Sequence, residues 1–170
     1  MRLEKKLISA LRSGDRNYLE KVFEEIYNTN FKLVHYVLSL YVPKENIEDL
    51  VQDTFVSFFN HLDTIEIDGS ISSYLTRSAH NFAVNFLKKA KIETSELIEE
   101  IVSYQDEDNS LIQLLSSILD KEEMDIIILH VIIGYSLKEI AKEKRKNLNT
   151  VKSVYFRAIK KAKAHLKELL

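Results

Sequence analysis

The sequence predicts an all-α protein made of two small helical domains. Its 170 residues include three glycines and one proline, so few positions interrupt a helix. Apolar residues recur at intervals of three and four along most of the chain, which is the period of an amphipathic helix. An acidic stretch without this period separates two periodic blocks. We therefore expect an N-terminal helix at 1–15, a domain at 16–90, an acidic linker at 91–110 and a second domain at 111–170.

Charge is distributed unevenly along the chain. The net charge is −2, but residues 91–125 contain 2 basic and 11 acidic side chains, whereas residues 126–170 contain 11 basic and 3 acidic ones. A basic C-terminal segment favours a polyanionic partner, because each neutralised phosphate releases condensed counterions. The acidic middle segment would repel the same partner.

Composition excludes several classes of site. The absence of cysteine rules out a disulfide, a thiolate zinc site or a thiol nucleophile, and fits a reducing compartment. The apolar run at residues 126–133 is far shorter than the roughly 20 residues of a membrane span and is expected to be a buried helix. The histidines do not cluster as metal ligands, and neither a Gly-rich phosphate loop nor a nucleophile–base set is present. We expect a cytoplasmic protein with no metal, no cofactor, no enzymatic activity and no membrane insertion.

The first block predicts a series of helices. Gly14 and Asp15 suit a helix C-cap followed by an N-cap, so a helix over 3–13 should be followed by a second one. Pro43 and Asn46 mark the stop of that second helix and the start of a third. The third helix is expected to end at Asp63. A loop from Asp63 to Gly69 and a long helix from Ser70 to about Ala90 should follow it.

The second block carries two helix-start signals. Asp120 precedes Glu123 by three residues, and Ser136 precedes Glu139 by the same interval. Each pair is typical of a capping box, in which the two side chains satisfy free amide groups at a helix N-terminus. Helices are therefore expected to start after Asp120 and after Ser136.

The C-terminal segment has the outline of a helix-turn-helix. The helix after Ser136 is followed by a charged break at 144–147 and a long basic helix from about Asn149 to Leu170. In such a pair the second helix enters the major groove of DNA with short polar and basic side chains toward the bases. An ordinary amphipathic helix with solvated lysines is the alternative. The expected inward face is Val151, Tyr155, Ala158, Ala162 and Leu166, which leaves Lys152, Ser153, Arg157, Lys160 and Lys161 on other faces.

A second motif lies upstream, in the segment Asp49-Leu-Val-Gln-Asp-Thr-Phe55. Its apolar side chains face inward on a helix, whereas Asp49, Gln52 and Asp53 share the outer side. Such an acidic polar patch suits a basic protein partner, and an ordinary solvated face is the alternative.

These two motifs, in this order, resemble bacterial RNA polymerase sigma factors of the extracytoplasmic-function (ECF) group. The resemblance covers about residues 20–90, like sigma region 2, and 112–168, like sigma region 4. In that family the first motif docks on the clamp helices of the polymerase, the next helix melts and reads the minus-10 promoter element, and the C-terminal helix pair reads the minus-35 element. The resemblance implies core polymerase contacts at Asp49, Leu50, Gln52, Asp53 and Phe55, minus-10 contacts at Tyr74, Arg77, Asn81, Asn85, Lys88 and Lys89, and minus-35 contacts at Ser136, Thr150, Lys152, Ser153, Arg157, Lys160 and Lys161.

Several residues depart from the family pattern. A charged turn at 144–147 replaces the usual apolar residue and glycine, so a remodelled turn is expected. Val154 and Phe156 replace a frequent arginine and a frequent basic residue, which would alter the reading of the minus-35 element. Tyr74 replaces the usual tryptophan, and it suits either a core aromatic or a nucleic-acid contact.

The implied function is that of a sigma factor. Its expected partners are core RNA polymerase and promoter DNA, with an anti-sigma factor as a further candidate. Two other classes stay open: a helix-turn-helix regulator that binds DNA without joining polymerase, and a degenerate sigma-like helical adaptor that binds only proteins. A sigma factor binds core polymerase, whereas the regulator and the adaptor do not.

Overall fold

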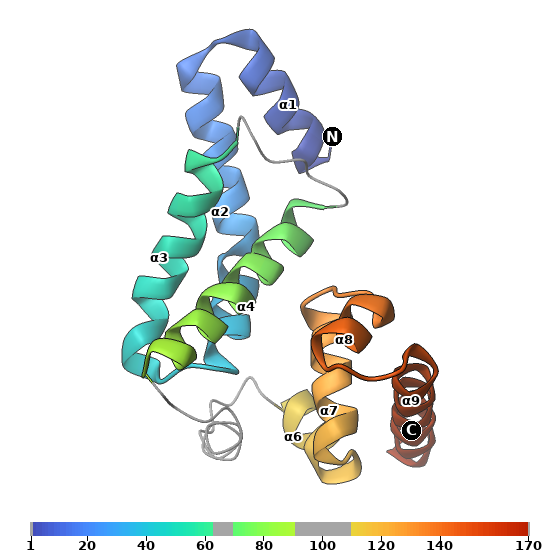
Figure 1. Ribbon diagram of the computed structural model, residues 1–170. Coiled ribbons are helices and arrows are strands. Elements are labelled where there is room, and N and C mark those ends of the chain that lie inside the picture. Colours follow the sequence, from blue (N-terminus) through green and yellow to red (C-terminus); the bar gives the residue numbers. More distant parts are fainter. Residues whose placement is uncertain (1, 63–69, 91–109, 170) are drawn as a thin grey trace. The chain divides into compact units, whose positions relative to one another are not determined.

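The computed structural model describes residues 2–62, 70–90 and 110–169. All regular secondary structure within these ranges is helical, which confirms the all-α prediction. The chain divides into two compact units, Met1–Ile101 and Val102–Leu170 (Figure 1). The predicted loop at 63–69 and residues 91–109 of the predicted linker lie outside the described residues.

The N-terminal unit is a bundle of helices built around a long central one. It contains α1 (Leu3–Ser13), α2 (Arg16–Ser39), α3 (Lys44–Asn60) and α4 (Ile71–Ala90). Helix α2 packs against the other three, and α3 also packs against α4 (Figure 1). The core lies where these helices meet and fully buries apolar side chains from all four, among them Leu7, Ile26, Val34, Leu38, Phe58, Ile71 and Leu75.

The corner between α1 and α2 follows the prediction from sequence. Gly14 ends α1 with a φ of 66°, in the left-handed region that favours glycine. The Asp15 carboxylate accepts hydrogen bonds from the backbone N–H groups of Asn17 (2.9 Å) and Tyr18 (3.2 Å), which caps α2. Both predicted caps are confirmed.

The start of α3 differs from the prediction. The helix begins at Lys44 directly after Pro43, so Asn46 lies within the first turn instead of marking its start. The carbonyl oxygen of Pro43 accepts the Asn46 N–H at 3.0 Å. Proline suits this position because its fixed φ is compatible with entering a helix and because it lacks an N–H that would need a partner.

Two polar contacts tie the N-terminus of α4 to the rest of the unit. The Glu4 carboxylate in α1 accepts a hydrogen bond from the Ile71 N–H at 3.0 Å, which satisfies a free amide in the first turn of α4. This bond lowers the pKa of Glu4 below its ordinary value. Ser72 donates to the side-chain oxygen of Asn30 at 2.6 Å, and the buried Asn30 amide donates to the Ile26 carbonyl at 2.8 Å. Helix α4 is therefore fixed from both α1 and α2.

The C-terminal unit is built around the last helix. It contains α6 (Ser110–Ile118), α7 (Lys121–Ile127), a π-helical turn η2 (Ile128–Ile132), α8 (Leu137–Glu143) and α9 (Leu148–Leu169). Helix α9 packs against α6, α7 and α8. The core of this unit includes apolar side chains of α7, η2, α8 and α9, among them Ile126, Leu129, Ile133, Ile140, Val151, Val154 and Ala158.

Both predicted capping boxes are present. The Asp120 carboxylate accepts from the Glu123 N–H at 2.9 Å, and Glu123 accepts from the Asp120 N–H at 3.0 Å. The Ser136 hydroxyl accepts from the Glu139 N–H at 3.2 Å, and Glu139 accepts from the Ser136 N–H at 2.7 Å. These reciprocal bonds start α7 and α8 at the residues that the sequence predicts.

The apolar run at 126–133 is only partly the buried helix that was expected. Its second half is the π-helical turn, in which the Ile133 N–H reaches back five residues to the Ile128 carbonyl at 3.0 Å. Ile126 and Ile133 are fully buried, whereas Val131 is 59% exposed. The wider turn changes which side chains face the core, because it rotates successive residues by less than an α-helix does.

The turn between α8 and α9 is closed by backbone hydrogen bonds of the Schellman type. The Lys146 N–H donates to the Ala141 carbonyl at 2.9 Å, and the Arg145 N–H donates to the Lys142 carbonyl at 3.2 Å. Arg145 has a φ of 52°, so it occupies the left-handed position at which helices commonly carry glycine. The charged turn therefore keeps a standard helix end without glycine.

Replacing Arg145 with glycine is expected to raise the free energy of unfolding of the C-terminal unit by about 0.5–1 kcal/mol, because glycine lacks the Cβ that disfavours a positive φ. Urea unfolding followed by amide NMR signals of α8 and α9 measures this change. Arg145→Ala is the matched control, since it removes the same charge but keeps a Cβ. An equal gain in both variants would assign the effect to the charge instead of the backbone.

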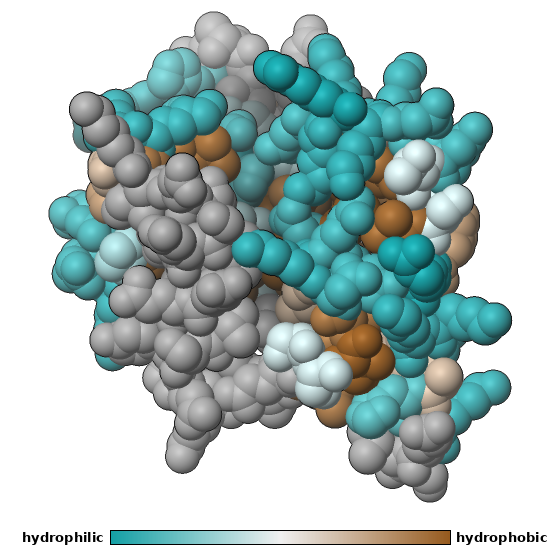
Figure 2. Space-filling model, turned by 60° about the horizontal axis from the view of Figure 1, so that its bottom comes forward, coloured by the Kyte–Doolittle hydropathy of each residue, from teal (hydrophilic) through white to brown (hydrophobic). Residues whose placement is uncertain are grey.

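Hydrophobic side chains reach the surface at a few places. None of the described helices combines the length and the apolar character that a membrane span needs. On the face drawn in Figure 2, hydrophobic residues form small brown areas bordered by teal hydrophilic ones. Large hydrophobic side chains that are more than half exposed include Val56 (53%), Val131 (59%) and Phe156 (63%).

Candidate nucleic-acid interface

Helix α3 exposes the polar half of the motif predicted to contact polymerase. Asp49, Gln52 and Asp53 are exposed, and their spacing of three and four residues places them on one side of the helix. Val56 follows three residues after Asp53 on the same side and is 53% exposed. This outer side of α3 thus offers two carboxylates, an amide and an apolar side chain to a partner.

Leu50 and Phe55, the apolar members of the motif predicted to contact polymerase, are buried. Their exposed fractions are 9% and 3%, and the ring centroid of Phe55 lies 4.7 Å from that of Tyr27 in α2. Both side chains face the bundle because they fall on the inner stripe of the helix. Their role in this structure is to hold α3 in place, so that the outer side is presented in a fixed orientation.

The predicted minus-10 residues form a row along α4. From Tyr74 to Lys88 successive members are three or four residues apart, which aligns them on one face over about 20 Å of helix, and Lys89 adjoins the last of them. The row changes from partly buried to open along its length. Tyr74 and Arg77 are half-buried, whereas Asn81, Asn85, Lys88 and the adjacent Lys89 are exposed.

Tyr74 has features of a core aromatic and of a nucleic-acid contact, the two interpretations considered from sequence. Its ring centroid lies 5.5 Å from that of the fully buried Phe58 in α3, with an interplanar angle of 51°. The ring is therefore part of the packing between α3 and α4, yet the side chain is only half-buried. An aromatic ring held in this way can stack on an unpaired base, which contributes roughly 1–3 kcal/mol per base.

Helix α9 exposes a row of basic side chains around a phenylalanine. Lys152, Phe156, Lys160 and Lys163 are all exposed, and their spacing of four, four and three residues places them on one face. Phe156 is 63% exposed and lies between Lys152 and Lys160, one turn away on either side. Phe156 and Lys163 were not among the predicted contacts, although their helical spacing from Lys152 would have placed them on the same face. We call these four residues the basic row.

The predicted hydroxyl contacts are placed differently from one another. The Ser136 hydroxyl caps α8, as described above. The Ser153 hydroxyl donates to the Asn149 carbonyl at 2.9 Å within α9, and Thr150 is exposed in the first turn of α9. Thr150 and Ser153 therefore lie near the start of α9, whereas Ser136 serves the start of α8.

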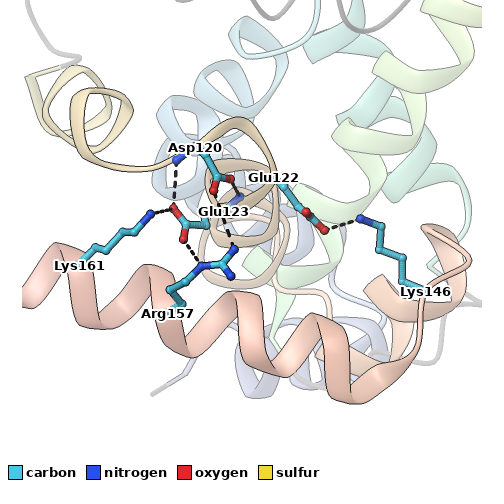
Figure 3. A network of polar contacts seen from close by, with 6 residues as sticks. All are labelled: Asp120, Glu122, Glu123, Lys146, Arg157 and Lys161. Carbon is cyan, nitrogen blue, oxygen red and sulfur yellow. Dashed lines mark hydrogen bonds and ion pairs between the residues drawn. The ribbon is translucent and has the colours of Figure 1, made fainter.

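Arg157 and Lys161 point toward α7 instead of joining the basic row (Figure 3). The Arg157 Nε donates to Glu123 Oε1 at 2.6 Å, and the Lys161 Nζ donates to Glu123 Oε2 at 2.7 Å. The Glu123 side chain is 0% exposed, whereas Arg157 and Lys161 are 53% and 39% exposed. The predicted minus-35 set is thus divided by the structure into an outward part and a part bound to α7.

The hydrogen bonds of this contact favour the charged forms of Glu123 and Arg157. Burial raises the pKa of the Glu123 carboxyl, but hydrogen bonds from Lys161, Arg157 and the Asp120 N–H outweigh burial and lower it from 4.5 to about 2. The hydrogen bond to Glu123 raises the pKa of the Arg157 guanidinium. The sequence identified Glu123 as a cap but not as an ion-pair partner, because the cations lie 34 and 38 residues further along the chain.

Two further ion pairs tie the turn to α7. Lys144 pairs with Asp125, and Lys146 pairs with Glu122 (Figure 3 shows the second pair). The acidic segment was expected to repel the partner of the basic one, but its C-terminal part neutralises four cations of the following segment. The carboxylates that do so lie at the start of or on α7: Asp120, Glu122, Glu123 and Asp125.

Comparison with known proteins shows similarity to sigma factors. Residues 26–92 match the model of sigma-70 region 2. The sequence is 25% identical to the ECF RNA polymerase sigma factor SigX of Bacillus subtilis over 172 residues, which cover 89% of this chain and 87% of SigX. The chain is similar to ECF sigma factors over most of its length. The similarity supports a sigma-factor role in transcription initiation.

A second curated protein is similar in sequence, and two solved structures are similar in fold. The ECF RNA polymerase sigma factor BldN of Streptomyces coelicolor is 19% identical, and the alignment covers 91% of this chain but 62% of BldN. The fold resembles CnrH, solved in complex with the cytosolic domain of CnrY, with a TM-score of 0.51, 22% identity and coverage of 96% and 97% of the two chains. It also resembles the sigma factor RpoE of Bartonella quintana, solved with the anti-sigma factor NepR, with a TM-score of 0.51, 21% identity and coverage of 85% and 95%.

Proposed function

We propose that this protein is an ECF sigma factor that binds core RNA polymerase through the outer side of α3 and recognises promoter DNA through α4 and α9. The proposal for α3 is supported by the exposed Asp49, Gln52 and Asp53, whose charge suits a basic partner surface. Val56 adds an apolar contact at the same side. The proposed partners place the protein in the cytoplasm.

The row on α4 is the observation that carries the proposal. It combines an aromatic ring, two exposed asparagines and two exposed lysines on one face of a helix that is tied to α1 and α2. Tyr74 would stack on a base of the opened minus-10 element, the asparagines would hydrogen-bond to base edges, and Lys88 and Lys89 would neutralise the backbone. These are the contacts that a protein needs to hold a single strand.

The basic row on α9 supports recognition of the minus-35 element. Lys152, Lys160 and Lys163 would contact phosphates, and Thr150 and Ser153 would hydrogen-bond near the start of the helix. Phe156 lies at the centre of the row and cannot form a hydrogen bond through its ring. An apolar side chain in the major groove suits the methyl group of thymine, so Phe156 would favour a thymine at its position.

Size-exclusion chromatography with purified core RNA polymerase tests the proposed function. Co-elution of the two proteins is the expected result. Binding to promoter DNA without binding to polymerase would favour a helix-turn-helix regulator that does not form holoenzyme. Binding to neither, with the protein folded, would favour a sigma-like adaptor for other proteins.

Charge reversal at Asp53, by Asp53→Lys, is expected to weaken binding to core polymerase at least ten-fold, because it places like charges opposite one another at the proposed interface. The helical circular dichroism should stay unchanged, since Asp53 is exposed. Glu20→Lys, at an exposed position on α2, is the matched control and should bind as the wild type does. A loss of helicity in Asp53→Lys would show that the residue is structural instead.

An anti-sigma factor is a further proposed partner. The Bartonella RpoE structure is described as a complex with an anti-sigma factor. A protein that covers the outer side of α3 would prevent the proposed docking on polymerase. Binding of core polymerase and of such a partner should therefore be mutually exclusive, and both should be sensitive to Asp53→Lys.

A further inference from the structure

One buried carboxylate on α7 holds two cations of α9. Figure 3 shows Arg157 and Lys161 reaching from successive turns of α9 to Glu123 at the start of α7. We propose that Glu123 is an anchor that sets the orientation of α9, and that Arg157 and Lys161 are positioning residues for this anchor instead of DNA contacts. The inference rests on the proposed role of α9 in reading DNA.

Burial makes the anchor difficult to release. Glu123 is 0% exposed, so its charge has no water to stabilise it and depends on its protein partners. Moving the Arg157 guanidinium to a phosphate would leave this buried charge with one cation fewer. The free-energy cost of breaking a buried ion pair exceeds the free energy gained from a solvent-screened ion pair at the surface. The two cations are therefore expected to stay with Glu123 when DNA is present.

The carboxylate is fixed from its own helix as well. Glu123 Oε2 accepts the Asp120 N–H at 3.0 Å, which completes the capping box of α7. Arg157 also approaches the Asp120 carboxylate, with Nη2 3.9 Å from Oδ2. The anchor point on α7 is thus rigid, because the bonds that cap the helix also orient the side chain that binds α9.

The two attachment points decide which face of α9 is outward. Arg157 and Lys161 are four residues apart, so they hold the helix at two successive turns and oppose rotation about its axis. Phe156 and Lys160 are their immediate neighbours in sequence and lie about 100° away around the helix. With Arg157 and Lys161 directed at α7, the basic row faces away from it.

A double-mutant cycle on the full chain tests the anchor without DNA. Glu123→Gln and Arg157→Gln are expected to be strongly coupled, with an interaction of about ten-fold in the folding equilibrium constant of the C-terminal unit, measured by urea unfolding with amide NMR signals of α7 and α9. Lys160→Gln is the matched control and should add independently to Glu123→Gln. Additive effects for both pairs would overturn the anchor. Lys161→Gln supplies a second arm if Arg157→Gln does not fold.

The salt dependence of DNA binding separates positioning from contact. With a short fluorescent DNA duplex as the probe, Lys160→Gln should reduce the slope of log affinity against log salt by about 0.9, as loss of one phosphate contact does. Arg157→Gln should weaken binding several-fold at every salt concentration with an unchanged slope. Arg157→Lys retains the cation and should recover most of the affinity. A slope that falls equally in Arg157→Gln and Lys160→Gln would overturn the proposal.

The two tests fail in distinguishable ways. If the wild-type protein binds neither the duplex nor promoter DNA in complex with polymerase, the proposed reading of DNA by α9 fails. In that case the double-mutant cycle still shows whether Glu123 and Arg157 are coupled, because it is measured without DNA. If the coupling is absent while DNA binding is present, the anchor fails and Arg157 returns to the set of DNA contacts.

Discussion

Acidification from about pH 5 to about pH 2 is expected to lower the free energy of unfolding of the C-terminal unit by about 3 kcal/mol through Glu123 alone. The pKa of this carboxyl is lowered from 4.5 to about 2 in the folded state. A lowered pKa stabilises the fold while the group is ionised, so the contribution is fully present above the unfolded pKa. It is lost as the pH falls toward the folded pKa.

The Glu123→Gln variant isolates this contribution. At neutral pH it should be less stable than the wild type, and the difference should shrink by about 3 kcal/mol on acidification over the same range. Urea unfolding at several pH values, followed by amide NMR signals of α7 to α9, gives both curves. Glu139→Gln is the matched control, because Glu139 has the equivalent capping-box position on α8 but is exposed. If acidification lowered the free energy of unfolding of Glu123→Gln as much as that of the wild type, the loss could not be assigned to Glu123.

Truncation of Phe58 is expected to destabilise the N-terminal unit by about 3–5 kcal/mol, as measured by urea unfolding of Phe58→Ala. The side chain is fully buried, and its ring centroid lies 5.3 Å from that of Phe59 and 5.5 Å from that of Tyr74. Removing the ring leaves a cavity between α3 and α4, and it removes the support of Tyr74. If Tyr74 contacts the minus-10 element as proposed, this contact should be weakened together with stability.

Val56→Ala is the control for this prediction. Val56 lies two residues before Phe58 on the same helix but is 53% exposed, so its truncation should change stability by no more than about 0.5 kcal/mol. It belongs to the outer side of α3, and it should weaken polymerase binding if that side is the docking surface. A cost below about 1 kcal/mol for Phe58→Ala would show that the helices close the cavity by moving together.

Local signals in the sequence predicted the ends of several helices well. The Gly14–Asp15 corner and the capping boxes at Asp120 and Ser136 were found because each depends on residues no more than four positions apart. Helical spacing also predicted the exposed side of α3. The start of α3 was missed because Pro43 and Asn46 both suit a helix start, and the choice between them depends on the chain before it.

Long-range contacts could not be predicted from spacing. The bonds of Glu123 to Arg157 and Lys161 join residues 34 and 38 positions apart. Likewise, Leu166 was expected on the inward face of α9 but is 44% exposed, whereas Val154, which was not expected there, is 5% exposed. Periodicity gives the relative angles of side chains around a helix, but which of them are covered depends on where the neighbouring helices lie.

The charge pattern shows the same limit. Dividing the chain at residue 125 placed the carboxylates of α7 in an acidic segment and their cations in a basic one. In the fold Lys144, Lys146, Arg157 and Lys161 pair with carboxylates of α7, so fewer cations are left for a partner than the charge of the segment suggests. Net charge by segment therefore overstated the number of cations that DNA can reach.

The bond from Ile71 to Glu4 also has a consequence for the order of events during synthesis. It joins residues 67 positions apart, so α1 and α2 leave the ribosome well before α4 can complete the bundle. The compact unit of Met1–Ile101 makes its internal contacts without residues of the second unit. Its folding can thus finish while α9 is still being translated, so the helix proposed to read DNA is the last element of the molecule to be made.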